Sequence, residues 1–451
     1  MIHKFSFDGT KIVLDVHSGS VHVVDDLVWA ILEYYGQKEP DEIIERLKGR
    51  FSPEEIREGL EELDSLREAG QLLAPDTHLE EYCVPAEPIL KSLCLHIAHD
   101  CNLRCRYCFA GTGHFGGDRS LMSLEVGRKA IDLLIERSGP RRHCEIDFFG
   151  GEPLLNFKVV QDLVAYGRQR AAEAGKEFKF TLTTNAVLLT PEVEKWLNDN
   201  GISVVLSLDG RPEVNDAMRT YVDGSGCYDE ILPNIKRFVE SRNNENYYVR
   251  GTFTHHNLDF SRDVLHVVEQ GFNLVSVEPV VAPPEEDYAF KPEDLPLLEQ
   301  EYENLTRAYL AKAEQGQPFN FFHFNLDLSG GPCLPKRLSG CGAGHVYLAV
   351  APDGRLYPCH QFVGREEFLV GDVFTGQLKR DLIKTFQKAH VYNKDKCQTC
   401  WAKFYCSGGC HANAYGANHD IYQPYETGCR LEKKRLECAI YIQARKTLFD
   451  T

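Results

Sequence analysis

The first eighty residues contain three short segments in which apolar and polar positions alternate. These segments, IHKFSF, TKIVLDV and SVHVVD, are separated by Asp-Gly and Ser-Gly pairs, and alternation bounded by turn residues predicts antiparallel strands. A helical pattern follows, with Ser52 as N-cap, Pro53 at the first helical position, Glu55 completing a capping box and Gly70 as the stop. Strands followed by helices in this order predict a winged-helix α+β domain over residues 1–80.

Beyond residue 90, strand-like apolar runs alternate with helical patterns such as LEVGRKAIDLLIER. Six such β/α units in series predict an α/β fold, a parallel sheet curved into a partial (β/α)6 TIM-like barrel over residues 90–320. In a sheet of this kind the functional groups gather at the carboxyl ends of the strands. The six runs are SLCLHIA from Ser92, CEIDFF from Cys144, FKFTLT from Phe178, SVVLSL from Ser203, YYVRGTF from Tyr247 and LVSVEPV from Leu274.

The last part of the chain, residues 333–451, has a different character. It is loop-rich and dense in Cys, Gly and aromatic residues. A region with so little apolar periodicity needs another source of order, and metal clusters can supply it. The sequence therefore predicts three domains, with a Pro-containing linker at residues 84–88 between the first and the second.

Composition narrows the function classes. No run approaches the roughly 18 apolar residues of a membrane-spanning helix, and the amino terminus lacks a basic start followed by an apolar run, so we expect a cytoplasmic protein. Thiols stay reduced there, and 16 cysteines then indicate metal ligation or catalysis. A net charge of −17 argues against nucleic acid and anionic membrane. Residues 1–80 carry 8 Lys or Arg against 18 Asp or Glu, which favours a peptide partner over DNA.

Three cysteines follow the first predicted barrel strand in the pattern C-x3-C-x2-C, as Cys101, Cys105 and Cys108. Three thiolates on a tight loop can hold three irons of a cubane cluster and leave the fourth iron open to a chelating ligand. The alternatives are a chance cluster or a structural zinc loop whose fourth ligand is His96 or His99.

With an aromatic Tyr107 before its last cysteine, this motif resembles the signature of the radical S-adenosylmethionine (SAM) superfamily. The resemblance implies a SAM-binding [4Fe-4S] cluster on the three thiolates. It also implies that the GGEP segment lines the SAM amino group, with Glu152 accepting its hydrogen bonds, and that other polar residues contact the ribose and carboxylate. The implied SAM contacts are Tyr107, Gly150, Gly151, Glu152, Asn185, Ser207, Asp209 and Arg219.

Each of these contacts has a structural alternative. The GGEP segment alone is a turn, Asn185 and Asp209 are common turn formers, and Arg219 can be solvated. The His255-His256 pair could hold a metal, but lining of the cavity or simple placement in a loop is the preferred interpretation.

Seven further cysteines near the carboxyl terminus resemble the SPASM domain, which carries two auxiliary [4Fe-4S] clusters in radical SAM peptide-modifying enzymes. The resemblance assigns one cluster to Cys397, Cys400, Cys406 and Cys429, and the other to Cys341, Cys359 and Cys410. Cys333 is the candidate for a fourth ligand to the second cluster; without it, one iron is open to a substrate thiolate. A zinc-ribbon interpretation leaves an odd thiol. The remaining cysteines read as ordinary thiols: Cys83, Cys94, Cys144, Cys227 and Cys438.

The whole chain resembles sactisynthases, and within them the maturases of Cys-rich SCIFF peptides. The resemblance implies a winged-helix module that binds the leader of a precursor peptide, with strand addition as the physical mode. It further implies SAM, three [4Fe-4S] clusters, an external one-electron donor of flavodoxin or ferredoxin type, and no nucleic-acid or membrane partner. The implied reaction cleaves SAM reductively and bonds a peptide Cys sulfur to the α-carbon of a residue such as Thr.

Two alternatives stay open at this stage. The same machinery could instead make a carbon-carbon or carbon-oxygen crosslink, or oxidise a protein Cys or Ser as in sulfatase maturation, although the amino-terminal module disfavours the sulfatase case. The third hypothesis is a zinc-stabilised binding protein without turnover.

Overall fold

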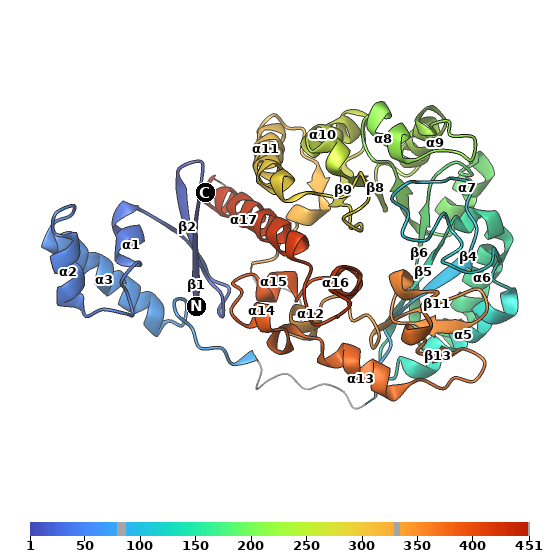
Figure 1. Cartoon of the computed structure of the whole chain (residues 1–451), viewed down its shortest axis with the longest axis horizontal. Coiled ribbons are helices and arrows are strands. Elements are labelled where there is room, and N and C mark those ends of the chain that lie inside the picture. The colour runs from blue at the N-terminus through green and yellow to red at the C-terminus, as the bar shows by residue number, and fades with distance from the viewer. Residues whose placement is uncertain (79–86, 329–333, 450–451) are drawn as a thin grey trace.

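The computed structural model describes residues 1–78, 87–328 and 334–449. Figure 1 shows a small amino-terminal part beside a larger body, with the long helix α17 (Glu426–Phe449) between them. Cys83, Cys333 and most of the predicted linker lie outside the described residues. Within the described ranges, no helix is both long enough and apolar enough to cross a membrane.

The amino-terminal part begins with a three-stranded antiparallel sheet in the order β1 (Ile2–Phe7), β2 (Thr10–Asp15), β3 (Val21–Val24). The helices α1 (Asp26–Ile31), α2 (Pro40–Leu47) and α3 (Pro53–Glu68) follow. The predicted capping box is confirmed: the Ser52 hydroxyl accepts from the Glu55 N–H, and the Glu55 carboxylate accepts from the Ser52 N–H. The assignment of this part to the winged-helix class stays a prediction.

The larger body contains six parallel strands that lie side by side in chain order, as predicted. Each observed strand begins and ends within one residue of its predicted run. The strands are β4 (Ser92–Ala98), β5 (His143–Gly150), β6 (Glu177–Thr184), β7 (Ser203–Ser207), β8 (Tyr247–Phe253) and β9 (Leu274–Pro279).

Helices connect these strands and cover the outer face of the sheet (Figure 1). Their inward sides and the outward-facing strand residues form one large apolar core. The connecting helices are α5 (Leu124–Arg137), α6 (Phe157–Glu173), α7 (Pro191–Asp199), α8 (Pro212–Met218), α9 (Tyr228–Ser241), α10 (Phe260–Glu269) and α11 (Leu295–Glu314).

The sheet extends beyond the six predicted strands at both edges. The strand β10 (Asn320–Phe321) pairs with β9, and β11 (Tyr347–Val350) pairs in parallel with β4, followed by β12 (Arg355–Tyr357) and β13 (Gly371–Asp372). Residues after 333 were predicted as a separate loop-rich domain, yet their first strands complete the barrel sheet. A four-residue apolar run is too short for periodicity to identify it, and the open edge of β4 provides its partner.

Short helices and one long helix form the rest of the carboxyl-terminal part. These are α12 (Leu334–Ser339), α13 (Arg380–Lys388), α14 (Asp395–Gln398), α15 (Lys403–Cys406), α16 (His411–Asn418) and α17. The 24-residue α17 packs along α11 and also contacts β1 and β3. Single-turn 3-10 helices occur at Pro153–Asn156, His255–Asn257, Pro292–Asp294, Phe322–Phe324, His360–Phe362, Glu366–Phe368 and Val391–Asn393.

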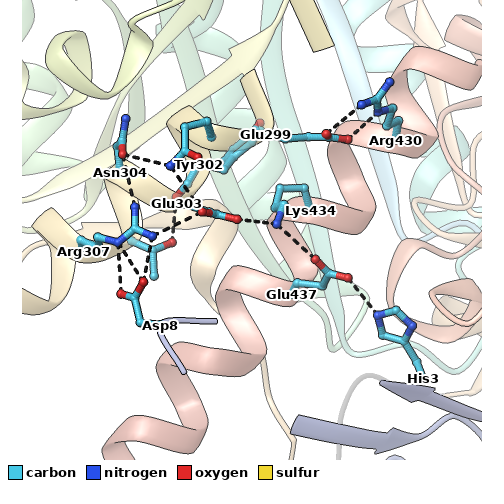
Figure 2. A network of polar contacts seen from close by, with 12 residues as sticks. His3, Asp8, Glu299, Tyr302, Glu303, Asn304, Arg307, Arg430, Lys434 and Glu437 are labelled. Atoms are coloured by element: carbon cyan, nitrogen blue, oxygen red, sulfur yellow. Dashed lines mark hydrogen bonds and ion pairs between the residues drawn. The ribbon is translucent and has the colours of Figure 1, made fainter. Parts of the chain in front are cut away.

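Polar contacts attach the amino-terminal sheet to the larger body (Figure 2). The His3 ring lies 2.9 Å from the Glu437 carboxylate of α17, and Arg307 of α11 lies 2.8 Å from Asp8. The His3 ring also stacks on Trp401, with ring centroids 3.8 Å apart. Because Trp401 follows Cys400, the amino-terminal part rests directly on the cysteine-rich segment.

Candidate active site

A cavity of about 480 Å³ opens at the carboxyl ends of the barrel strands, and we call it the barrel cavity. Its lining combines the loop after β4 with the ends of β5 to β9 and with residues after β12. Ten residues singled out from the sequence line it together: Cys101, Cys105, Tyr107, Cys108, Gly150, Gly151, Asn185, Ser207, Asp209 and Arg219.

The cysteine loop, residues 101–108, is held in place by hydrogen bonds to nearby side chains and to a neighbouring segment. The Asp100 carboxylate accepts from the Cys101 N–H at 2.8 Å, and the Arg104 guanidinium donates to the Leu103 carbonyl at 2.8 Å. The Arg104 N–H also donates to Thr220, which fixes the loop against the segment after α8. Three thiols are thereby presented on one side of the barrel cavity.

Burial controls the chemistry of these thiols. It raises the pKa of Cys101 to about 11 and that of Cys105 to about 12, with the nearby Cys108 adding to both shifts. Buried thiols this close together are stable as thiolates only beside a strong positive charge such as a metal centre. The donor set, three thiols on one tight loop facing an open cavity, fits a cluster that keeps one iron available for another ligand.

The two glycines of the GGEP segment allow a close approach between backbones. Gly150 has φ of +124°, and a Cβ there would lie 2.3 Å from the Ala98 carbonyl oxygen. A Cβ on Gly151 would lie 2.1 Å from the Asp100 carbonyl oxygen. The turn after β5 therefore packs directly under the start of the cysteine loop, which only glycine permits.

Glu152 does not line the barrel cavity, although the sequence placed it on the SAM amino group. Its buried carboxylate accepts hydrogen bonds from the N–H of Leu154 at 3.0 Å, the N–H of Asn185 at 2.8 Å and the hydroxyl of Thr184 at 2.9 Å. Burial raises its pKa to about 7. In this arrangement Glu152 orients Asn185, whose side-chain amide lies 3.6 Å from the Cys101 sulfur.

Tyr107 of the cysteine loop forms a polar network with the buried residues Asp209 and Arg219. The Tyr107 hydroxyl contacts both Asp209 oxygens at 2.9 and 2.7 Å, and Arg219 donates to the Tyr107 hydroxyl at 3.1 Å. Burial raises the pKa of Asp209 to about 6. Arg219 is buried, not solvated, and its Nε has no hydrogen-bond partner among the described residues. An unsatisfied guanidinium beside a cavity suits an anionic group such as a carboxylate.

The His255-His256 pair lies outside the barrel cavity. His255 contacts Asp294 at 2.7 Å, and His256 contacts Asp287 at 3.3 Å. Asp287 also pairs with Arg106 of the cysteine loop. These contacts agree with the interpretation of the pair as part of a structural loop.

A second, smaller cavity of about 60 Å³ is surrounded by four of the predicted cluster cysteines, and we call it the four-thiol pocket. Its thiols come from α14, the turn after it, the end of α15 and the first turn of α17. Four thiols around one small space fit a fully ligated iron–sulfur cluster. They are Cys397, Cys400, Cys406 and Cys429.

The remaining predicted set also comes together. Cys410 and Cys341 lie close enough to Cys359 to raise the pKa of its buried thiol, after burial itself. Cys359 in turn influences Cys94 on β4, so this set borders the barrel. Among the described residues, no group of three or more His, Cys, Asp or Glu side chains is arranged as a site for a metal ion. The thiols of each set are therefore spaced more widely than the ligands of a single metal ion.

Sequence reasoning missed a buried lysine beside the thiols. Lys394 is fully buried, and its ammonium donates to the Gly408 carbonyl at 2.7 Å. Burial lowers its pKa, whereas cysteines of both carboxyl-terminal sets, Cys397 and Cys410 among them, raise it. Sequence reasoning also missed the polar residues inside the barrel; the alternation of inward and outward positions along each strand could have identified these.

Comparison with known proteins matches residues 95–259 to the Radical SAM superfamily. The chain is 24% identical over 361 residues to the cysteine-type anaerobic sulfatase-maturating enzyme of Clostridium novyi, covering 74% of this chain and 93% of that protein. Two solved structures share the fold. Native anSMEcpe with bound AdoMet and Cp18Cys peptide is 21% identical with a TM-score of 0.64, covering 79% of this chain and 99% of that one. Streptococcus suis SuiB bound to precursor peptide SuiA is 16% identical with a TM-score of 0.54, covering 95% and 98%.

Proposed function

This chain is a radical SAM enzyme with its radical SAM domain at residues 95–259, and from this premise we propose that it installs thioether crosslinks in a Cys-rich precursor peptide. The observation that carries the proposal is the coexistence of three thiol sets in one chain. The set that includes Cys101 faces the barrel cavity, and the set that includes Cys359 borders the barrel. The set that includes Cys397 surrounds a small pocket of its own. Such an arrangement suits a reaction that generates a radical, binds a substrate sulfur and removes an electron.

In this proposal Cys101, Cys105 and Cys108 hold the SAM-binding [4Fe-4S] cluster. When bound, the reduced cluster and SAM supply methionine and a 5′-deoxyadenosyl radical. The protein contributes orientation: Arg219 receives the SAM carboxylate, and Tyr107 fixes Arg219 through its hydroxyl. The polar groups of Asn185, Ser207 and Asp209 lie at the ends of two neighbouring strands, β6 and β7, and line the cavity. They are proposed to receive the ribose.

The two carboxyl-terminal sets are proposed to hold auxiliary [4Fe-4S] clusters. The four-thiol pocket leaves no ligand position open, which suits electron transfer. The set of Cys341, Cys359 and Cys410 supplies three thiols among the described residues and borders the barrel, which suits binding of a substrate thiolate. The one-electron donor is proposed to be of flavodoxin or ferredoxin type.

A groove along β3 is the proposed site for the peptide leader. The groove, about 850 Å³, is lined by β3, by apolar residues of α1 and α3, and by Ala444 of α17. Among the described residues, β3 pairs with β2 alone, so its other edge is open to a further strand. Strand addition gives affinity through backbone hydrogen bonds, and pockets such as those beside Leu63 and Leu66 read alternate side chains. Asp25 and Glu62 in the lining favour a basic leader.

Anaerobic reconstitution with SAM, a reductant and a Cys-rich peptide encoded beside this protein tests the proposal. Mass spectrometry should find the loss of two hydrogen atoms per thioether and the matching loss of thiols that iodoacetamide can alkylate. A product that has lost sulfur instead would support oxidation of a Cys, as in sulfatase maturation; the Clostridium novyi relative is named a cysteine-type anaerobic sulfatase-maturating enzyme. Recovery of the peptide unchanged while deoxyadenosine accumulates would contradict both.

A further inference from the structure

The interior of the barrel is polar below the level of the cysteine loop. Barrels of this kind are normally filled by layers of branched apolar side chains. Here the barrel cavity extends between the strands, and its wall includes Cys94 of β4, Asp147 of β5, Thr181 of β6, Arg250 of β8 and Glu278 of β9. The inner wall therefore offers hydrogen bonds and charge to whatever enters from the carboxyl ends of the strands.

Asp147 lies in the middle of this wall. It pairs in register with Cys94 on one side and with Thr181 on the other, three positions before Gly150. The Thr181 hydroxyl hydrogen-bonds to its carboxylate. The side chain thus faces the space beneath the cysteine loop and the GGEP turn.

Three carboxylates line the barrel cavity, and their surroundings differ. Asp209 accepts hydrogen bonds from Tyr107 and from the Thr252 N–H. Glu278 forms an ion pair with Arg250 at 3.0 Å. Asp147 accepts a hydrogen bond from the Thr181 hydroxyl, but among the described residues it forms no ion pair within 4 Å, so it can take up a proton without breaking one.

The charged and titratable groups around Asp147 come from its own strand and from the strands beside it. Glu145, two residues earlier on β5, and the Cys94 thiol lie beside it, with Tyr347 of β11 beyond Cys94. Lys91 lies 3.0 Å from Glu145 and acts on Asp147 only at longer range. Burial, reinforced by Glu145, raises the pKa of Asp147 to about 6. The group is therefore ionised near neutral pH and still basic enough to accept a proton.

Asp147 is connected to the carboxyl-terminal thiols through Cys94 and Tyr347. The Tyr347 hydroxyl hydrogen-bonds to the Cys94 thiol and lies 3.2 Å from the His360 ring. His360 follows Cys359, and Cys359 is close enough to influence Cys94. A substrate sulfur bound beside Cys359 would approach the wall of the cavity that carries Asp147.

We propose that Asp147 accepts the proton of the substrate Cys thiol as the thioether forms. This inference rests on the proposed thioether function. In the reaction, the substrate S–H and C–H bonds break and an S–C bond forms. The hydrogen atom from carbon goes to the 5′-deoxyadenosyl radical, the proton from sulfur goes to the Asp147 carboxylate, and the remaining electron goes to an oxidised iron–sulfur cluster.

The test compares Asp147→Asn, Asp147→Glu and the control Glu145→Gln in the full-length holoenzyme. The control removes a carboxylate from the same strand that does not line the cavity. Loss of a general base costs about 10²–10⁴-fold in rate, so Asp147→Asn should lower crosslinking by about 100-fold or more while deoxyadenosine still forms. Asp147→Glu should restore part of the rate. Glu145→Gln should keep the wild-type rate at neutral pH and shift the acid fall of the rate to lower pH, because Glu145 raises the pKa of Asp147.

The pH profile separates proton transfer from a structural effect. Below the Asp147 pKa of about 6 the wild-type crosslinking rate should fall, because the carboxylate becomes protonated. Asp147→Glu should keep an acid limb and Asp147→Asn should lose it. An unchanged crosslinking rate in Asp147→Asn, or equal loss of deoxyadenosine formation, would overturn the role of Asp147 and leave the proposed function standing. Absence of any thioether with the wild-type enzyme would overturn the proposed function and this assignment with it.

Discussion

Two regions of the molecule collect cysteines in opposite ways. The cysteine loop places three thiols within eight consecutive residues, on the rim of a cavity of about 480 Å³. The four-thiol pocket draws its thiols from residues 397–429 and arranges them around about 60 Å³. Three thiols leave one iron of a cubane cluster free for another ligand, whereas four thiols can ligate every iron. The two regions therefore differ in whether a substrate or cosubstrate can reach the metal centre that each is proposed to hold.

The largest expected effect concerns the open site. Replacing Cys101, Cys105 and Cys108 by Ala should abolish SAM cleavage, because no other thiol set in the described part of the chain lines the rim where SAM is proposed to bind. Three cubane clusters contain about 12 irons, so iron per reconstituted chain should fall to about 8. Iron analysis and deoxyadenosine measurement check this. Intact deoxyadenosine formation would remove the site assignment, and zinc in place of iron would reject the cluster interpretation.

The enclosed site should give a different result. Cys406→Ala should remove about 4 irons and abolish crosslinking, yet leave deoxyadenosine formation because the open site is intact. Thermal stability should fall as well, since α14, α15 and α17 are proposed to share this cluster. The control is Cys438→Ala, which alters a buried thiol of α17 outside the pocket. Equal loss of deoxyadenosine formation would show that the two sites are not functionally separate.

A smaller effect is expected at the groove along β3, which shares no lining residue with either thiol region. Val23→Lys adds a positive charge at a position that is 42% exposed and lines the groove proposed to bind a basic leader. It should weaken binding of a fluorescent leader peptide by about tenfold, as a loss of 1.4 kcal/mol would produce. Deoxyadenosine formation without peptide should not change. Val222→Lys, on an exposed part of the barrel, is the matched control, and equal affinities for the two variants would remove the leader-binding claim.

The smallest effect is expected at the contact between the amino-terminal sheet and the barrel (Figure 2). Asp8→Asn removes the ion pair with Arg307, in which both side chains are about two-fifths exposed. Solvent screening limits such a pair to less than about 1 kcal/mol. Urea unfolding should therefore shift only slightly, with Asp26→Asn, a pair within the amino-terminal part, as control. A shift well above that of the control would show that this contact holds the module in place.

The parts that were predictable from sequence are those with strong local signals. All six barrel strands follow from apolar runs bounded by turns, and the capping box at Ser52 fixes the start of α3. The gathering of Cys101, Asn185 and Asp209 at one cavity follows from the rule that parallel strands end at one edge.

Other features depend on contacts between distant segments. The strand β11 is four residues long and is defined by pairing with β4. The helix α17 has a mixed pattern because it contacts α11 on one side and the amino-terminal sheet on another. Glu152 was expected to face SAM, but three protein donors occupy its carboxylate. No local pattern distinguishes a carboxylate that binds a ligand from one that braces its neighbours.

The most direct test of the account uses a Cys-rich substrate peptide that carries deuterium at the α-carbon of the crosslinked residue. After anaerobic turnover, deuterium in 5′-deoxyadenosine and thioether in the peptide are measured by mass spectrometry on the same sample. The account predicts one deuterium transferred for each thioether formed at that α-carbon. Deoxyadenosine without deuterium alongside a thioether-bearing peptide, or deuterium transfer into a product without a sulfur–carbon bond, would contradict it.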